Sequence, residues 1–177
     1  MYQPTISRRL VAIRISEPEN ECRENLALLV SVVLSLLAGF AGAWFAPDMA
    51  VTYEMMYKPA IAPPSWVFGP VWAFLYILAG ISAYRVFAAG HDAGRAKDAL
   101  FYYGVLLALN FIWPILFFRF GLKGVALLEI ILLAVLAVVT AVKFSLVDSA
   151  AGWLMVPYMI WVIYACILNF SVLNTNL

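Results

Sequence analysis

Charged residues are scarce in this chain of 177 residues, because only 12% are Asp, Glu, Lys or Arg and the net charge is +1. A soluble domain carries about 25% charged residues. The small net charge provides no basic surface for phosphates, so we expect no nucleic-acid partner. The shortage of charge also predicts that much of the surface faces something other than water.

Residue types that bind metals or carry out catalysis are scarce as well. Cys22 and Cys166 are far apart in the sequence, so they form neither a disulfide framework nor a zinc motif. His91, the single histidine, lies in a charged loop with no second ligand at metal spacing, and we expect no metal site. The chain also lacks a Ser/His/Asp set, paired carboxylates, a phosphate-binding glycine loop and an HExxH motif. We therefore expect no conventional enzyme.

Apolar residues are abundant and make up 66% of the chain, against about 45–50% in a soluble domain. Five apolar stretches each approach the roughly 20 residues that a membrane-spanning helix needs. They cover residues 26–46, 66–88, 99–118, 122–144 and 150–173. The predicted fold is an all-α integral membrane protein: a bundle of five transmembrane helices over residues 26–177, with residues 1–25 as a polar tail. Its first partner is the lipid bilayer.

The lysine and arginine residues are distributed unevenly between the two ends of the predicted helices. Eight of the eleven lie on the side of the N-terminus. The positive-inside rule then predicts a cytoplasmic N-terminus in a bacterial cell membrane, with the 47–65 connection outside. A bacterial or mitochondrial outer membrane remains the alternative.

The connection between the first two predicted spans is stiff and rich in proline. Pro59, Pro63 and Pro64 fix the backbone φ angle and remove three hydrogen-bond donors. Ser65 stands at the N-cap position of the following helix, just before Trp66. Two interpretations are open: a lid over a pocket, or an aromatic anchor at the membrane interface.

Polar residues within membrane spans are energetically costly, so each is a candidate for function. For Glu129, a structural acid that faces the bundle interior is favoured over a functional role. Asn110, in the middle of the third span, must find a partner on another helix or on a ligand. For Asn169 and Asn174, in the fifth span, a structural role in capping or interhelical hydrogen bonds is weighed against a functional one, and is favoured for Asn174.

The six tryptophans fall into two groups. Three lie near predicted helix ends, where aromatic belts form: Trp44, Trp66 and Trp153. Three lie deeper: Trp72, Trp113 and Trp161. The deeper group either packs helices together or lines a cavity for a flat polyaromatic ligand.

Three long motifs occur in a fixed order along the chain. They are KPxxxPPxWVxGPVWxxLY over residues 58–76, LALNxxWPxxFF over residues 107–118, and PYxxWxxxAxxLN over residues 157–169. Together they resemble the signatures of the translocator protein / tryptophan-rich sensory protein (TspO/MBR) family. The resemblance covers about residues 26–174.

This resemblance implies a five-helix bundle, often a homodimer, that binds porphyrins such as protoporphyrin and heme-type tetrapyrroles. The resemblance implies that the protein requires no cofactor. It also implies a pocket between the helices, with the connection between the first two spans as its lid. The implied ligand-binding residues are Pro64, Trp66, Trp72, Asn110, Trp113, Phe117, Trp161, Ala165 and Leu168. Glu129 stands where the family usually has Asp. Gly104 and Ala108 match a dimer face of bacterial members.

The resemblance leaves several functions open. The expected one is a membrane receptor or sensor for porphyrins. Trp72 and Trp161 match two tryptophans linked in bacterial members to light-dependent porphyrin degradation, which is one alternative; transport of tetrapyrroles or other lipophilic metabolites is another. The lid has Ile61 in place of a usual Trp, and the C-terminus lacks a Tyr followed by Lys or Arg. The proposed cholesterol motif is therefore absent, which favours a bacterial, tetrapyrrole-binding member.

Overall fold

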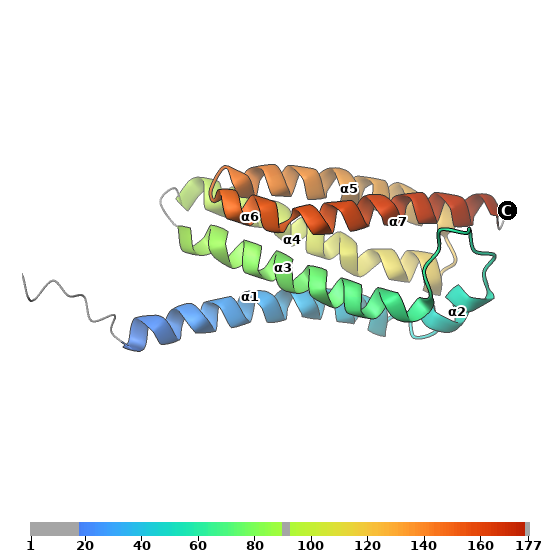
Figure 1. Cartoon of the computed structure of the whole chain (residues 1–177), viewed down its shortest axis with the longest axis horizontal. Helices are drawn as coiled ribbons and strands as arrows, with labels where there is room; N and C mark the ends of the chain where they lie inside the picture. Colours follow the sequence, from blue (N-terminus) through green and yellow to red (C-terminus); the bar gives the residue numbers. More distant parts are fainter. Residues whose placement is uncertain (1–17, 90–92, 176–177) are drawn as a thin grey trace, which may run out of the picture.

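The computed structural model of this protein describes residues 18–89 and 93–175, and every regular element within these ranges is a helix. The α-helices are α1 (Pro18–Trp44), α2 (Met49–Met55), α3 (Phe68–Ala89), α4 (Ala93–Pro114), α5 (Lys123–Ser145), α6 (Ser149–Leu154) and α7 (Val156–Thr175) (Figure 1). A 3₁₀ turn, Ser65–Val67, precedes α3, and a π-helical turn, Ile115–Arg119, follows α4.

Five helical segments in the described ranges are long and apolar enough to cross a membrane. They are Glu21–Trp44, Ser65–Ala89, Ala93–Arg119, Lys123–Ser145 and Ser149–Thr175, the last formed by α6 and α7 together. This number agrees with the predicted bundle of five transmembrane helices.

Two of the long helices begin several residues earlier than their apolar stretches do. The first begins at Pro18 rather than residue 26, and the third at Ala93 rather than residue 99. Proline suits the first turn of a helix, and the acidic side chain of Glu21 is favourable near its positive end. Hydropathy marks only the apolar part of a helix. Residues 1–17 of the predicted tail and the predicted loop residue His91 lie outside the described residues.

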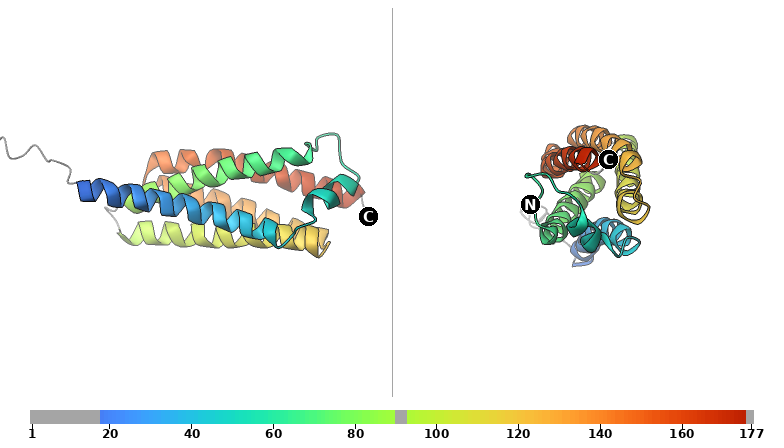
Figure 2. Two further views of the ribbon diagram at one scale, coloured as in Figure 1. Left: turned by 90° about the horizontal axis from the view of Figure 1, so that it is seen from below. Right: turned by 90° about the vertical axis from the view of Figure 1, so that its right-hand side faces the viewer.

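The long helices surround a common core, in the order α1, α3, α7, α5, α4 when the bundle is seen end-on (Figure 2). The core contains fully buried side chains from α3, α4, α5 and α7, such as Val86, Leu106, Phe144 and Tyr158. Helix α1 is peripheral, since only 11% of its most apolar stretch is buried, and it packs on α3 and α4. Most of its apolar side chains therefore face outward.

Helices α1 and α3 approach each other closely because of a glycine. A Cβ atom at Gly80 would lie 2.6 Å from the Cα atom of Val32, which is closer than any side chain tolerates. Ser31 Oγ donates a hydrogen bond of 2.8 Å to the carbonyl oxygen of Gly80. Small residues thus allow backbone contact in a membrane bundle.

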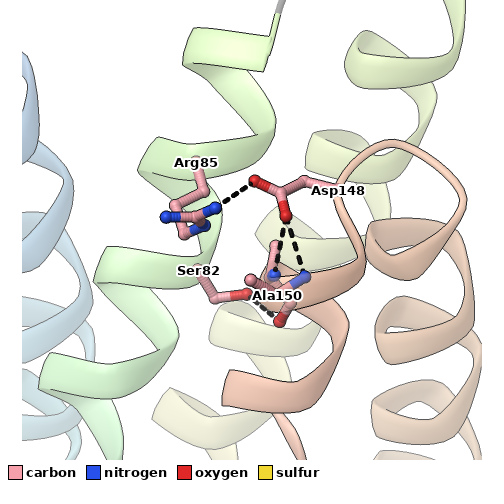
Figure 3. Close-up of polar contacts among 5 residues, drawn as sticks. Ser82, Arg85, Asp148 and Ala150 are labelled. Atoms are coloured by element: carbon pink, nitrogen blue, oxygen red, sulfur yellow. Dashed lines mark hydrogen bonds and ion pairs between the residues drawn. The ribbon is translucent and has the colours of Figure 1, made fainter.

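Polar contacts join the helices at the end of the bundle where α3 finishes and α6 starts (Figure 3). Arg85 forms an ion pair of 2.8 Å with Asp148. Asp148 is the N-cap of α6, and its Oδ1 accepts hydrogen bonds from the backbone N–H groups of Ala150 and Ala151. Ser82 Oγ donates to the carbonyl oxygen of Ala151 at 2.6 Å. These contacts fix α3 against the turn between α5 and α6.

Three prolines lie within the membrane-spanning segments, and they have different effects. Pro114 is the last residue of α4 and is followed by the π-helical turn. Pro157 lies just after the break between α6 and α7 at Met155. Pro70 lies in the first turn of α3, where its missing N–H would have had no helical partner anyway, and the helix continues.

Candidate ligand-binding site

A cavity of about 220 Å³ lies between the helices. Its lining belongs to the end of the bundle that carries α2 and the C-terminal end of α7, which is the right-hand end in Figure 1. Residues from all five membrane-spanning segments and from α2 line it. Six of the predicted ligand-binding residues are among them: Trp72, Asn110, Trp113, Phe117, Ala165 and Leu168. The tertiary structure therefore gathers residues from three separate sequence motifs at one site.

The other three predicted ligand-binding residues lie elsewhere. Trp66 is 73% exposed on the outside of the bundle. Pro64 is exposed at the start of the 3₁₀ turn. Trp161 lies behind the cavity wall, with its ring in edge contact with Trp72 at 6.4 Å and with Phe68 at 6.1 Å between centroids. The geometry thus places Trp161 as a support for Trp72.

Two stacked aromatic pairs form much of the cavity wall. Trp72 stacks on Tyr76, with centroids 5.5 Å apart and planes 25° apart. Trp113 stacks on Phe117 at 5.0 Å and 22°. Aromatic faces of this kind provide large apolar contact areas for a flat ligand. By contrast, Trp44, Trp66 and Trp153, which were predicted to lie near helix ends, are all strongly exposed.

Asn110 is held by the protein. Its Nδ2 donates to the carbonyl oxygen of Leu106 at 2.8 Å and to Tyr158 Oη at 2.5 Å. Its Oδ1 accepts a hydrogen bond of 3.2 Å from Tyr76 Oη. Both amide hydrogens are thus used. Of the two alternatives that the sequence left open for Asn110, the structure provides partners on other helices.

Asn169 has the opposite character. It lines the cavity, its residue is only 2% exposed, and its Nδ2 and Oδ1 atoms have no hydrogen-bond partner among the described residues. The cap or interhelical hydrogen bond considered from the sequence is therefore not formed there by any residue the structure describes. Trp113 Nε1 is likewise buried without a partner in this part of the chain. Sequence reasoning did not include Asn169 in the site, although it ends the third motif.

Sequence reasoning also missed the contribution of α1 and α2. Gly39, Phe40 and Ala43 of α1 line the cavity, as do Met49 and Tyr53 of α2. No motif marks these positions, and α2 was expected to be part of a loop. Tyr76 also lines the cavity, and its place at the end of the first motif was the available signal.

The 56–64 connection covers this end of the bundle and is tied to its neighbours. Tyr53 Oη donates to the carbonyl oxygen of Pro63 at 2.7 Å, and Tyr164 Oη donates to that of Ile61 at 2.8 Å. Met56 and Ala62 pack on the apolar cluster around Phe117 and Leu168. These contacts favour the lid interpretation of the connection. We call residues 56–64 the lid below.

Two side chains of α2, next to the lid, have pKa values that differ from their usual ones: Tyr53 and Glu54. Burial raises the pKa of Tyr53 to about 12, so its hydroxyl keeps its proton and remains a donor. Hydrogen bonds from Lys58 and Ser65 hold the pKa of the Glu54 carboxyl below its usual range. The prediction of Ser65 as an N-cap is wrong: Pro64 occupies that position, and Ser65 begins the 3₁₀ turn with its side chain directed to Glu54. Because Pro64 has no side-chain oxygen, it cannot accept a capping hydrogen bond, and the segment begins with a 3₁₀ turn instead.

Glu129, Gly104 and Ala108 lie outside the cavity. Both carboxyl oxygens of Glu129 are buried, and no described residue hydrogen-bonds to them. Gly104 and Ala108 are exposed on α4. A Cβ atom at Gly104 would meet no described atom within 4 Å, so this face points away from the bundle. It stays a predicted dimer face.

Comparison with known proteins agrees with these features. The model of the TspO/MBR family matches residues 31–174. The tryptophan-rich protein TspO of Chlorobaculum tepidum is 34% identical over 155 residues, which are 87% of this chain and 98% of that protein. The protein of the same name from Archaeoglobus fulgidus is 37% identical, covering 86% of this chain and 99% of the relative. The Homo sapiens translocator protein is 36% identical over 79% of this chain and 84% of its own length.

Proposed function

The chain belongs to the TspO/MBR family and is an integral membrane protein, and from this premise we propose that it is a receptor or sensor that binds porphyrins in the cavity beneath the lid. The observation that carries this proposal is the pair of stacked aromatic walls, Trp72 on Tyr76 and Trp113 on Phe117. A flat tetrapyrrole ring would find matching flat surfaces there. The small side chain of Ala165 keeps the space between the helices open.

Titration of purified protein with protoporphyrin IX tests this proposal. We expect saturable quenching of tryptophan fluorescence, because Trp72 and Trp113 line the cavity. Ala165→Leu should weaken binding by filling the space, whereas Ala88→Leu, on the exposed surface of α3 at the far end, should not. Circular dichroism spectra that match the wild type would exclude misfolding as the cause. An absence of saturable quenching in the wild type would overturn the proposal.

Light-dependent porphyrin degradation is the second candidate function. It is favoured by one observation: Trp72 lines the cavity and contacts the ring of Trp161 in edge-on geometry at 6.4 Å. The indole of Trp72 would thus contact the ligand, and the indole of Trp161 would contact that of Trp72. Illumination of the protoporphyrin complex should bleach the porphyrin absorption, and Trp161→Phe should slow that bleaching while binding remains. If the porphyrin bleaches at the same rate in the wild type and in Trp161→Phe, Trp161 has no role in the degradation.

We further propose a homodimer that associates through the α4 face of Gly104 and Ala108, with the N-terminus in the cytoplasm of a bacterial cell. The exposure of both residues supports the interface. In a background without Cys22 and Cys166, Gly104→Cys should form an oxidised dimer. The control is Gly124→Cys, a similarly open position on α5. Cross-linking at both positions alike would count against the α4 interface.

A further inference from the structure

Two asparagines line the same cavity but differ in their hydrogen bonding. Asn110 uses its amide group on Leu106, Tyr76 and Tyr158. Asn169 keeps both amide atoms buried, and none of the described residues hydrogen-bonds to them. The indole N–H of Trp113, on α4, is also buried, and no described residue accepts a hydrogen bond from it. The cavity lining therefore contains unused donors and an unused acceptor.

Such groups are unfavourable in a membrane protein. Within the hydrocarbon region no bulk water is present to replace a missing partner, so a buried amide without a hydrogen bond destabilises the fold. The hydroxyl groups of the lining and the amide of Asn110 do have partners. Tyr53 donates to Pro63 and Tyr76 donates to Asn110, while Ser65 hydrogen-bonds to Glu54. Among the described residues, Glu129, Thr140 and Trp161 also have buried polar atoms without a partner, but they do not line the cavity; within the lining, the buried unsatisfied groups are those of Asn169 and Trp113.

We propose that Asn169, assisted by Trp113, is the specificity-determining polar site of this cavity and binds a hydrogen-bonding group on the edge of an otherwise flat, apolar ligand. This inference rests on the proposed function and identifies its ligand class further. The amide of Asn169 offers two donor hydrogens and the indole of Trp113 offers one, against the single amide oxygen as acceptor. An acceptor-rich edge, such as a carboxylate or an ester carbonyl, fits this set. The stacked aromatic walls would hold the ring and the Asn169 wall would orient it.

The same reasoning predicts how each asparagine affects stability. Leu has nearly the shape of Asn and needs no hydrogen bond. Asn169→Leu should therefore leave the thermal midpoint of the ligand-free protein unchanged or raise it, because an unsatisfied group is removed. Asn110→Leu should lower that midpoint, because the hydroxyls of Tyr76 and Tyr158 lose a partner. A residue that weakens ligand binding when replaced, without a loss of stability, acts on the ligand rather than on the fold.

The experiment compares two porphyrins with the same ring. Protoporphyrin IX carries two carboxylates at its edge, and etioporphyrin carries only alkyl groups. We expect the wild type to prefer protoporphyrin IX by about tenfold, the value of one hydrogen bond to a charged group. Asn169→Leu should abolish most of this preference and leave etioporphyrin affinity unchanged. Asn174→Leu, on the same helix but exposed and outside the cavity lining, should behave as the wild type.

Several outcomes would overturn the inference. Equal weakening of both porphyrins by Asn169→Leu would indicate a packing effect, and an unchanged preference would remove Asn169 from recognition. If Asn169→Leu fails to fold, Trp113→Phe decides, because it keeps an aromatic ring but removes the N–H. It should reduce the ratio of protoporphyrin IX affinity to etioporphyrin affinity a few-fold, whereas the loss of ring area weakens both porphyrins alike and leaves this ratio unchanged. A wild type that binds neither porphyrin would refute the proposed function and this inference with it. A wild type that binds both with equal affinity would refute the inference alone.

Discussion

The two ends of the bundle are built on different principles. At the end where α3 meets α6, Arg85, Asp148 and Ser82 satisfy one another or the backbone, and Phe144 and Val86 are fully buried. At the other end, a cavity separates the helices and Asn169 finds no hydrogen-bond partner among the described residues. One end contributes stability. The other end gives up packing and hydrogen bonds for a space that a ligand can fill.

Asn110 lies at the boundary between these two regions, and its replacement should have the largest effect. Asn110→Leu leaves the hydroxyls of Tyr76 and Tyr158 without their amide partner in the core. With about 1–3 kcal/mol for each buried group left unpaired, we expect a loss of about 3 kcal/mol in the free energy of unfolding. Thermal unfolding in one detergent checks this value. If Asn110→Leu lowers the free energy of unfolding no more than a substitution on the exposed surface does, the hydrogen bonds of Asn110 do not contribute to the stability of the bundle.

Asp148→Ala tests the stable end itself. The change removes the N-cap of α6 together with the ion pair to Arg85. Loss of a cap costs about 1 kcal/mol, and an ion pair that is partly exposed adds less. We expect a total near 1–2 kcal/mol by thermal unfolding, with porphyrin affinity unchanged. Asp148→Asn is the matched control, because its amide oxygen keeps the cap, and it should lose only a part of that stability.

Tyr164→Phe tests how firmly the lid holds the cavity end closed. It removes the 2.8 Å hydrogen bond to the carbonyl oxygen of Ile61 and leaves the ring in place. One exposed hydrogen bond contributes about 0.5–1.5 kcal/mol, so a few-fold increase in both the association and dissociation rates of protoporphyrin is expected in stopped-flow fluorescence. Tyr84→Phe, at the opposite end of α3, serves as the control. Unchanged rates in Tyr164→Phe would show that the lid is held by packing alone.

The smallest expected effect is a pH dependence of the lid. Hydrogen bonds from Lys58 and Ser65 lower the pKa of Glu54 below the usual 4.5. These contacts therefore stabilise the closed lid above pH 4.5, and their contribution is lost as the pH falls through the lowered pKa. The dissociation rate of protoporphyrin should rise slightly below pH 4.5. Glu54→Gln should remove that rise, and a rise that persists in this variant would assign it to another group.

Much of the fold could be predicted because the solvent imposes it. A chain that is 66% apolar needs the bilayer, and five apolar stretches of spanning length then give five helices. The residues alone left open whether Trp72 and Trp113 pack helices together or line a cavity, and the resemblance assigned them with Asn110 to one pocket. The structure does place all three around one cavity. Helix α2 could not be predicted, since its seven residues have no repeating apolar pattern long enough to stand out.

Hydrogen-bond pairing lay beyond the sequence for a different reason. Asn110 and Asn169 are the same residue type, each embedded in an apolar span, and nothing local distinguishes them. Whether an amide has a partner depends on side chains from other helices: Tyr76 and Tyr158 come within reach of Asn110. No described residue forms a hydrogen bond with the amide of Asn169. Likewise, the sequence predicted Ser65 as a helix N-cap, but in the structure Ser65 forms a hydrogen bond with Glu54.

By itself, the sequence determined that this protein lives in a membrane, that it spans it five times, and which motifs it carries. Composition and segment length decide those properties, because the transfer of each helix into lipid depends on its own residues. Only the tertiary structure decided that α1 and α2 complete the cavity, that the ring of Trp161 contacts that of Trp72, and that the amide of Asn169 has no hydrogen-bond partner among the described residues. Those properties depend on distances between helices, and packing alone sets such distances.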